Sequence, residues 1–414
     1  MRIVVLDDSD EDDLRTREVA LACASEGMPV AWAGAEERRA LVDHLVARGA
    51  PRDAAARAVT RPSNERAGSN PATEGIHTGA ARNALLLATA GRVVLLSDGD
   101  IQCVADAPVG DGPPALCDRP DPMEFEFVSR EEDLPRGLPD VDVFGAYERA
   151  LGSPAGARVL CATAGLRGSS GMGLPFTRLL CDGPSRARLL GAADYDGVVT
   201  RGLVRRAPRG LTYVAGPFGL AGHLALDNRS PLPPFATEGR NQDGVFFALR
   251  CRLFPRALTG LLPFTVFHQP ARPVTRDEIA LGAGRVRIND FLVHAALRIP
   301  VQSRGATEEE RARVLGEHLS DFAASEGFAR AFVDWYRESR LLWLARTDEA
   351  LASEQAAPDA WRADVLAIRD TLADGIARAS AEALPVDDAR RSLADLAALL
   401  VAWPALRRAA ERPD

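Results

Sequence analysis

The sequence predicts an α/β fold with a mostly parallel sheet flanked by helices, followed by a C-terminal all-helical region. Apolar runs typical of buried strands alternate with helical patterns over the first 300 residues. From Ala306 onward, apolar residues recur only at helical spacing. The 414 residues, 46% of them hydrophobic, are enough for roughly two or three domains. We therefore expect one domain at 1–300 and a helical domain at 301–414.

The N-terminal region is predicted to be built from short strands and helices in alternation. Strands that end in polar residues are expected at 2–9 and 93–97, since continuous apolar runs are typical of buried parallel strands. Two Gly-containing segments, 105–140 and 165–175, are expected to be surface loops. The glycine content of 165–175 is that of a mobile loop. The remaining predictions are helices at 15–27, 36–49 and 80–90, and strands at 28–33, 157–163 and 211–216.

The tail is predicted to contain about four helices. Val365, Ile368 and Leu372 follow the spacing of one helix face, as other apolar residues do further on. Thr307 with Glu310 forms the pattern of a capping box, which predicts the start of the first of these helices. The amphipathic helices fit an acceptor platform, a homodimer interface or a buttress for the sheet.

The composition excludes several classes of protein. The net charge is −8, and a nucleic-acid binder would need a basic face. All 50 basic residues are Arg. The absence of Lys excludes a P-loop ATPase, an ordinary protein kinase, a pyridoxal-phosphate enzyme and a phosphoacceptor receiver domain. The six Cys form no CxxC pair, and no apolar run approaches the length of a membrane span. We expect a cytoplasmic protein with no membrane span.

The strongest chemical motif is SDGDI at 97–101. Asp98 and Asp100 follow a predicted buried strand, so their carboxylates are expected at the sheet edge where ligands of open α/β sheets bind. Two hard oxygen ligands at this spacing suit Mg²⁺ or Mn²⁺. The alternative is an Asp-Gly turn that only ends a strand.

The segment 75–101, GIHTGAARNALLLATAGRVVLLSDGDI, resembles a segment of GT-A-fold glycosyltransferases, in particular family-2-like nucleotide-sugar transferases. In that family an Ala-Arg-Asn helix precedes a strand and its DxD motif. The resemblance implies a GT-A-like sheet, with Asp98 and Asp100 as metal and ribose contacts and with Arg82 and Asn83 near the nucleotide.

The run RIVVLDDSD at 2–10 is similar to the second strand of the same family, in which an acidic residue recognises the base. The resemblance makes Asp7 and Asp8 the candidates for this contact. The same run is similar to the start of a receiver domain, but that fold requires a Lys, and the chain has none.

The segment 232–270 is similar to the part of the family that carries an acidic pair at a helix start and a later His. Here the pair is Gln242-Asp243, and the resemblance implies that Asp243 is the general base. The alternative is a helix cap. His268 is implied as a third metal ligand, with a buried structural His as the alternative. Arg167, in the Gly-rich loop, is a candidate to fold over the donor phosphates, with surface charge as the alternative.

The hypothesis is a glycosyltransferase that depends on a divalent cation, Mn²⁺ or Mg²⁺. It would transfer a sugar from a nucleotide-sugar donor, a UDP-sugar by preference, to the hydroxyl of an unknown acceptor (small molecule, glycan or peptide) with inversion. The alternative is a catalytically degenerate sugar-nucleotide-binding protein that acts through its helical tail, favoured by Gln242 in place of an acid.

Overall fold

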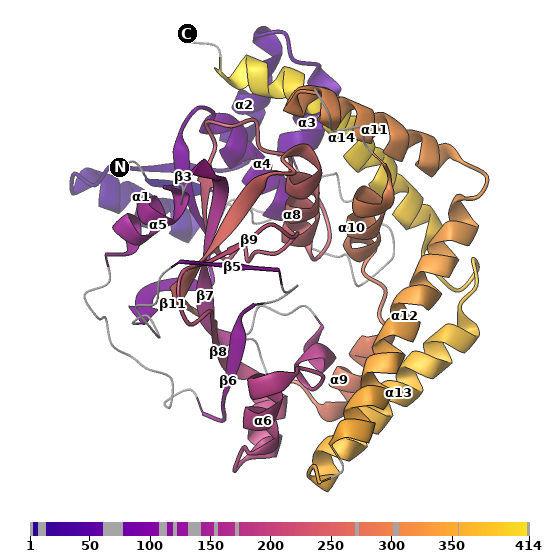
Figure 1. Ribbon diagram of the computed structural model, residues 1–414. Helices are drawn as coiled ribbons and strands as arrows, with labels where there is room; N and C mark the ends of the chain where they lie inside the picture. Colours follow the sequence, from indigo (N-terminus) through magenta and orange to yellow (C-terminus); the bar gives the residue numbers. More distant parts are fainter. Residues whose placement is uncertain are drawn as a thin grey trace.

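The computed structural model describes residues 3–6, 14–60, 78–106, 114–118, 122–130, 142–152, 156–169, 174–269, 273–300, 306–354 and 356–411. Figure 1 shows a sheet near the centre and long C-terminal helices along one side of it. The described chain combines strands and helices in its first 300 residues and is helical from residue 308 to 411. The predicted α/β class and the C-terminal helical region are therefore confirmed.

The central sheet has nine strands and is mixed. Among the described strands of this sheet, β7 with β11 and β5 with β9 pair in parallel, whereas the other six pairs are antiparallel. Six strands follow one another in the order β3 (Val93–Ser97), β10 (His223–Asp227), β7 (Arg158–Ser169), β11 (Ala257–His268), β9 (Thr212–Val214) and β5 (Ala115–Cys117). Of the other three, β4 (Ile101–Asp106) pairs with β11, and β8 (Leu203–Ala207) pairs with both β7 and β6 (Glu124–Val128).

The prediction of a mostly parallel sheet is therefore wrong. It was based on the continuous apolar runs at 2–9 and 93–97, which were also expected to be buried. That expectation is wrong as well, because the described residues of β1 are exposed or half-buried and Leu96 is the buried residue of β3, whereas β7 is buried along most of its length. An apolar run indicates that both faces of a strand are covered, and the central strands of a mixed sheet meet that condition as well as parallel ones do. The apolar pattern of a single run therefore establishes neither the burial nor the direction of its strand.

The N-terminal strands form a sheet of their own. β1 (Ile3–Leu6) and β2 (Val30–Ala33) pair in parallel around α1 (Leu14–Ser25), as the alternating pattern predicts. The helices that follow along the α/β part are α2 (Ala35–Ala47), α3 (Arg52–Val59), α4 (Thr78–Ala88), α5 (Val143–Leu151), α6 (Gly183–Leu190), α7 (Tyr195–Arg201), α8 (Gln242–Leu253), α9 (Arg276–Leu281) and α10 (Ile288–Arg298). Asp7 and Asp8 lie outside the described residues.

Four helices make up the described tail, as predicted. They are α11 (Glu308–Ala324), α12 (Phe328–Ser353), α13 (Asp359–Arg378) and α14 (Val386–Glu411). The capping box of Thr307 and Glu310 is formed at the start of α11. α11 packs along α14, and α12 packs along α13. None of the described helices is both long enough and apolar enough to cross a lipid bilayer.

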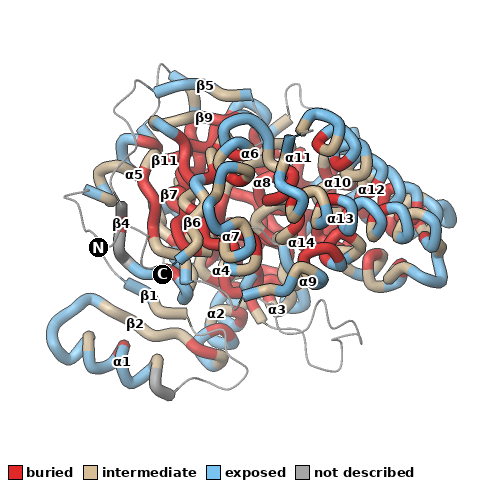
Figure 2. The backbone as a smooth tube through the Cα atoms, turned by 90° about the horizontal axis from the view of Figure 1, so that it is seen from below, coloured by how far each residue is buried: buried red, intermediate tan, exposed pale blue. Residues whose placement is uncertain are grey.

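The tail shares its hydrophobic core with the first 300 residues. The largest core cluster joins α2, α3, α4, α8 and α10 to α11 and α14. The indole N–H of Trp403 donates to the carbonyl of Leu232 (2.6 Å), and that of Trp361 donates to the carbonyl of Leu179 (3.1 Å). Figure 2 shows buried residues along β7, β11 and α8, and exposed ones on the outer faces of α12 and α13. The tail is a buttress of the α/β part.

Arg407 fixes α14 to the α/β part. Its side chain is fully buried, and its guanidinium donates to the carbonyls of Leu86 (3.1 Å) and Asn228 (2.9 Å) and to the side chain of Asn228 (2.7 Å). A buried carbonyl without a hydrogen-bond donor destabilises the folded state, because it has lost its hydrogen bonds to water. This one side chain therefore connects α4, the end of β10 and α14.

We expect Arg407→Met to lower the free energy of unfolding by roughly 3 kcal/mol, since several buried acceptors lose their donor. Chemical denaturation measures the loss. Arg408→Met is the matched control, because the neighbouring Arg408 side chain is 57% exposed and the change should stay within about 0.5 kcal/mol. Equal losses in the two variants would contradict the role given to Arg407.

Candidate functional site

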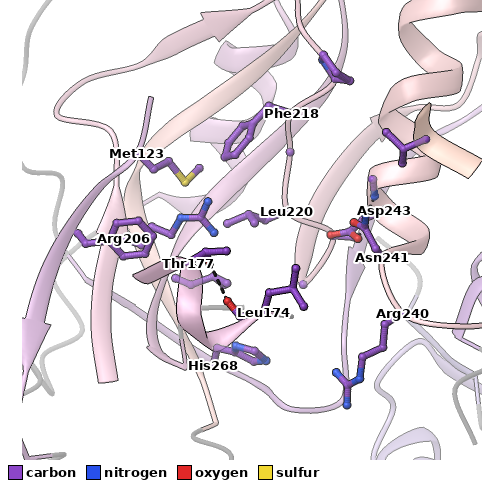
Figure 3. A pocket seen from close by; sticks show the side chains of 18 of the residues that line it. Met123, Leu174, Thr177, Arg206, Phe218, Leu220, Arg240, Asn241, Asp243 and His268 are labelled. Carbon is purple, nitrogen blue, oxygen red and sulfur yellow. Dashed lines mark hydrogen bonds between the residues drawn. The ribbon is translucent and has the colours of Figure 1, made fainter. Parts of the chain in front are cut away.

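A cleft of about 750 Å³ lies between the sheet and the tail. Its walls come from the turn after β3, the start of α4, residues 217–222, the start of α8, the end of β11 and α12. Figure 3 shows Asp243 and Asn241 on one side of this cleft, and His268 and Arg206 on others. Four of the predicted site residues, far apart in the sequence, line it: Arg82, Asp98, Asp243 and His268.

Asp98 and Asp100 occupy a tight turn between β3 and β4. The N–H of Asp98 donates to the carbonyl of Gly222 (2.9 Å), and the N–H of Ile101 donates to the carbonyl of Asp98 (3.1 Å). β3 pairs with β10, whereas β4 pairs with β11. The turn therefore carries the chain from one part of the sheet to another, and its two carboxylates stand where the strands separate.

Arg82 pairs with Asp98. One guanidinium nitrogen lies 2.7 Å from each oxygen of the Asp98 carboxylate, and the guanidinium also lies over the ring of Phe235, 5.5 Å from its centroid. Burial raises the pKa of Asp98, the Arg82 charge works against this, and the charges of Asp100 and Asp243 add to the rise. Asp98 thus belongs to a crowded acidic group that depends on a nearby cation.

Asp100 pairs with His268, the last residue of β11. The two side chains meet at 3.1 Å between Asp100 Oδ2 and His268 Nε2. The hydrogen bond from His268 lowers the pKa of Asp100 despite its partial burial. Burial disfavours the charged imidazole, but the hydrogen bond and charge of Asp100 outweigh it, so the pKa of His268 is raised. The backbone continues the contact, because the N–H of Gln269 donates to the carbonyl of Asp100 (2.8 Å).

The donor set of these residues suits a hard divalent cation, with carboxylate oxygens and one imidazole nitrogen. Two neighbouring ligands of an octahedral cation lie roughly 3 Å apart, close to the 3.1 Å between Asp100 and His268. The Asp98 carboxylate is engaged by Arg82. Within the described part of the chain, no group of three or more His, Cys, Asp or Glu is placed to hold a metal. Asp100 and His268 therefore fit two positions of a metal site, whereas Asp98 is paired with Arg82.

Asp243 lies in the first turn of α8, and the loop before it is held firmly. Asn241 caps α8 with a left-handed backbone (φ 70°), a conformation that Asn tolerates better than most residues. Its amide donates to Asp290 (2.7 Å), which also pairs with Arg287 (2.8 Å). Gln242, in the family's acidic position, is buried and accepts from the Thr78 hydroxyl (2.5 Å). Both residues of the pair line the cleft, where Gln242 is almost fully buried and Asp243 is half-buried.

Among the described residues, three predicted site residues lie outside the cleft lining: Asp100, which contacts the lining residue His268, and Asn83 and Arg167. Asn83 is fully buried, and its amide both donates to and accepts from the backbone of Phe235 (3.0 and 2.8 Å), so it has a structural role. Arg167 was predicted in a mobile loop, but it lies in β7 with its side chain buried against the ring of Phe267. The described backbone at 165–169 is a strand, which contradicts the loop prediction there and the lid role of Arg167.

Several lining residues were not predicted. Arg240 and Asn241 directly precede the Gln242-Asp243 pair, so their position beside a candidate base was a usable signal. Trp343 and Arg346 of α12 line the cleft as well. Their i, i+3 spacing puts them on one helix face, but nothing in the sequence shows that this face meets the sheet. The tail thus supplies part of the cleft wall.

In comparisons with known proteins, no family model and no curated protein matches the chain. The function is therefore argued from the geometry of the cleft and the motifs that form it.

We expect Asp100→Asn to lower the pKa of His268, since the amide keeps the shape of the partner but removes its charge. In the unsubstituted protein the imidazolium should persist to a higher pH than in a free histidine, because its pKa is raised. An NMR titration of the His side chains measures both values. His223 is the internal control: burial lowers its pKa to about 4, and the substitution should leave it unchanged. A His268 pKa that does not respond would contradict the pairing.

Proposed function

We propose that the protein is a glycosyltransferase that transfers a sugar from a nucleotide-sugar, a UDP-sugar by preference, to an acceptor hydroxyl with inversion. The observation that carries the proposal is the meeting of Asp98, His268 and Asp243 around one cleft. The cleft volume of about 750 Å³ falls within the range of small-molecule sites, roughly 300–1,000 Å³. The resemblance of 75–101 and 232–270 to GT-A-fold enzymes supports the same function.

The donor diphosphate is assigned to the side of the cleft formed by Arg82, Asp98 and His268. Breaking the bond between the sugar and the phosphate adds negative charge to the departing diphosphate, so cationic groups placed there in advance stabilise the transition state. Asp98, Asp100 and His268 would hold a divalent cation, Mn²⁺ or Mg²⁺, which supplies further positive charge when bound. Arg82, which pairs with Asp98 in this structure, would bind phosphate oxygens of the donor with its guanidinium.

Asp243 is assigned the role of general base. Its carboxylate faces the cleft from the start of α8, on the other side from His268 (Figure 3). A base in this position can take the acceptor proton while the hydroxyl oxygen attacks the anomeric carbon from the face opposite the diphosphate. The hydrogen bond from Asn241 to Asp290 restricts the motion of the start of α8, which carries this carboxylate.

The alternative is a sugar-nucleotide-binding protein without turnover. It is favoured by the Arg82–Asp98 pair, in which a guanidinium occupies a carboxylate that the enzyme would need for its cation. A binding protein would retain nucleotide affinity without a divalent cation and would release no nucleoside diphosphate. A homodimer through the tail remains a separate proposal, for which the exposed Leu341 and Leu342 of α12 are candidates.

Incubation with Mn²⁺ and a panel of nucleotide-sugars should release free nucleoside diphosphate from one of them, because water replaces the missing acceptor. We expect Asp98→Ala and Asp100→Ala each to abolish the release, since each removes a carboxylate assigned to the cation. Asp118→Ala is a control outside the cleft lining and should keep the rate. Unchanged hydrolysis in both variants would contradict the metal assignment, and release by no donor would favour the binding protein.

Asp243→Asn should lower the transfer rate by about 10²–10⁴-fold, because the amide cannot accept the proton. Nucleotide affinity, measured by calorimetry, should stay near that of the unsubstituted protein. Asp277→Asn, a first-turn aspartate of α9 away from the cleft lining, is the matched control. Transfer at the unsubstituted rate would exclude Asp243 as the base.

A further inference from the structure

The two sides of the cleft differ in chemistry. The donor side carries Arg82, Asp98 and His268, whereas on the other side one charged group, the guanidinium of Arg206, lies over aromatic rings. A second part of the lining consists of Met123, Phe125, Leu166, Phe218 and Leu220, which we call the apolar compartment. Figure 3 shows Met123, Phe218 and Leu220 grouped near Arg206, across the cleft from Asn241. Asp243 lines the same cleft as this compartment.

Flat groups border the apolar compartment. The guanidinium of Arg206 lies over two rings, 5.1 Å from the centroid of Phe125 and 5.5 Å from that of Phe218. Met123, Phe125 and Leu220 are buried, whereas Phe218 is half-buried and packs against the same core. The compartment is therefore a preformed apolar surface with stacked planar groups, and such surfaces favour planar apolar ligands.

Three hydrogen-bonding residues beside the apolar compartment, Ser185, Thr177 and Glu124, already have partners in the protein. Ser185 accepts from the N–H of Phe125 (3.0 Å), and the Thr177 hydroxyl donates to the carbonyl of Leu174 (2.7 Å). Glu124 pairs with Arg188 (3.1 Å) and with a second arginine. A glycan or peptide would bring many polar groups here and lose its bonds to water without equivalent partners. The apolar compartment therefore disfavours a glycan or a peptide as the acceptor.

We propose that the apolar compartment is the acceptor subsite and that the acceptor is a small molecule with a planar apolar body and a hydroxyl group, such as a phenol. This inference rests on the proposed function. Asp243 takes the hydroxyl proton, and the acceptor oxygen forms a bond to the anomeric carbon. The bond from that carbon to the diphosphate oxygen breaks, and the nucleoside diphosphate leaves with the electron pair.

Binding is tested first, without turnover. Naphthol, a fluorescent phenol, should bind the full-length protein saturably, and Phe218→Ser should weaken its affinity by about tenfold or more. Leu366→Ser is the control, because Leu366 is 44% exposed on α13 and outside the cleft lining. Leu220→Asn serves as the second variant, and circular dichroism verifies the fold of each. No saturable binding, or equal affinity in folded variants of the compartment, would overturn the proposal.

Transfer is tested second, with the donor that the hydrolysis assay identifies. Added naphthol should be converted to its glycoside, whereas methyl glucoside and a serine-containing peptide should remain unmodified. Glycosylation of the sugar or the peptide but not of naphthol would overturn the acceptor class and leave the glycosyltransferase intact. If no donor releases nucleoside diphosphate, the enzyme proposal fails on its own, and the naphthol titration alone decides whether the compartment binds planar apolar molecules.

Discussion

The charge balance at the turn between β3 and β4 is the constraint on which the rest of the site depends. Two carboxylates stand at the ends of a three-residue turn, and close like charges of this kind need compensation. Arg82 compensates Asp98, and His268 compensates Asp100. The first cation comes from α4 and the second from the end of β11. The same electrostatic requirement that holds the turn therefore also gathers α4, β3, β4 and β11 around one cleft.

The tail completes this cleft, although the sequence separates it as a helical region. Trp343 and Arg346 of α12 are part of the lining, and Phe176 contacts Trp343 edge-on (5.2 Å). α14 is fixed to the α/β part through Arg407 and Trp403. The boundary predicted near residue 300 marks a change in sequence pattern, whereas the hydrophobic core continues across it. Of the three roles the sequence left open for the tail, a buttress is the one the packing supports.

Local features were predictable because they depend on neighbouring residues. The capping box at Thr307 and the strand ending before Asp98 are examples. Strand direction and long-range pairing depend on contacts that no local pattern contains. The glycine content of 165–175 was interpreted as mobility, but Gly165 and Gly168 allow close packing of strands: a Cβ on Gly168 would meet the carbonyl oxygen of His268 at 2.3 Å, and one on Gly165 would meet that of Arg206 at 2.4 Å. Glycine content alone does not separate these two causes.

Arg82 and Asn83 show that a sequence motif predicts where residues lie more accurately than it predicts what each of them does. They are adjacent on α4, where successive side chains point about 100° apart, so one reaches the cleft and the other is buried. Both contact Phe235, Arg82 through the ring and Asn83 through the backbone. Two hydrogen bonds then connect the chain after Phe235 to α10. The Asn289 amide donates to the carbonyl of Glu238 (2.8 Å), and the Asn241 amide donates to the Asp290 carboxylate. These hydrogen bonds connect α4, which carries the partner of Asp98, to the start of α8, which carries Asp243. Asn83 is buried and lies outside the cleft lining, but through these bonds it helps to set the distance between Asp98 and Asp243 across the cleft.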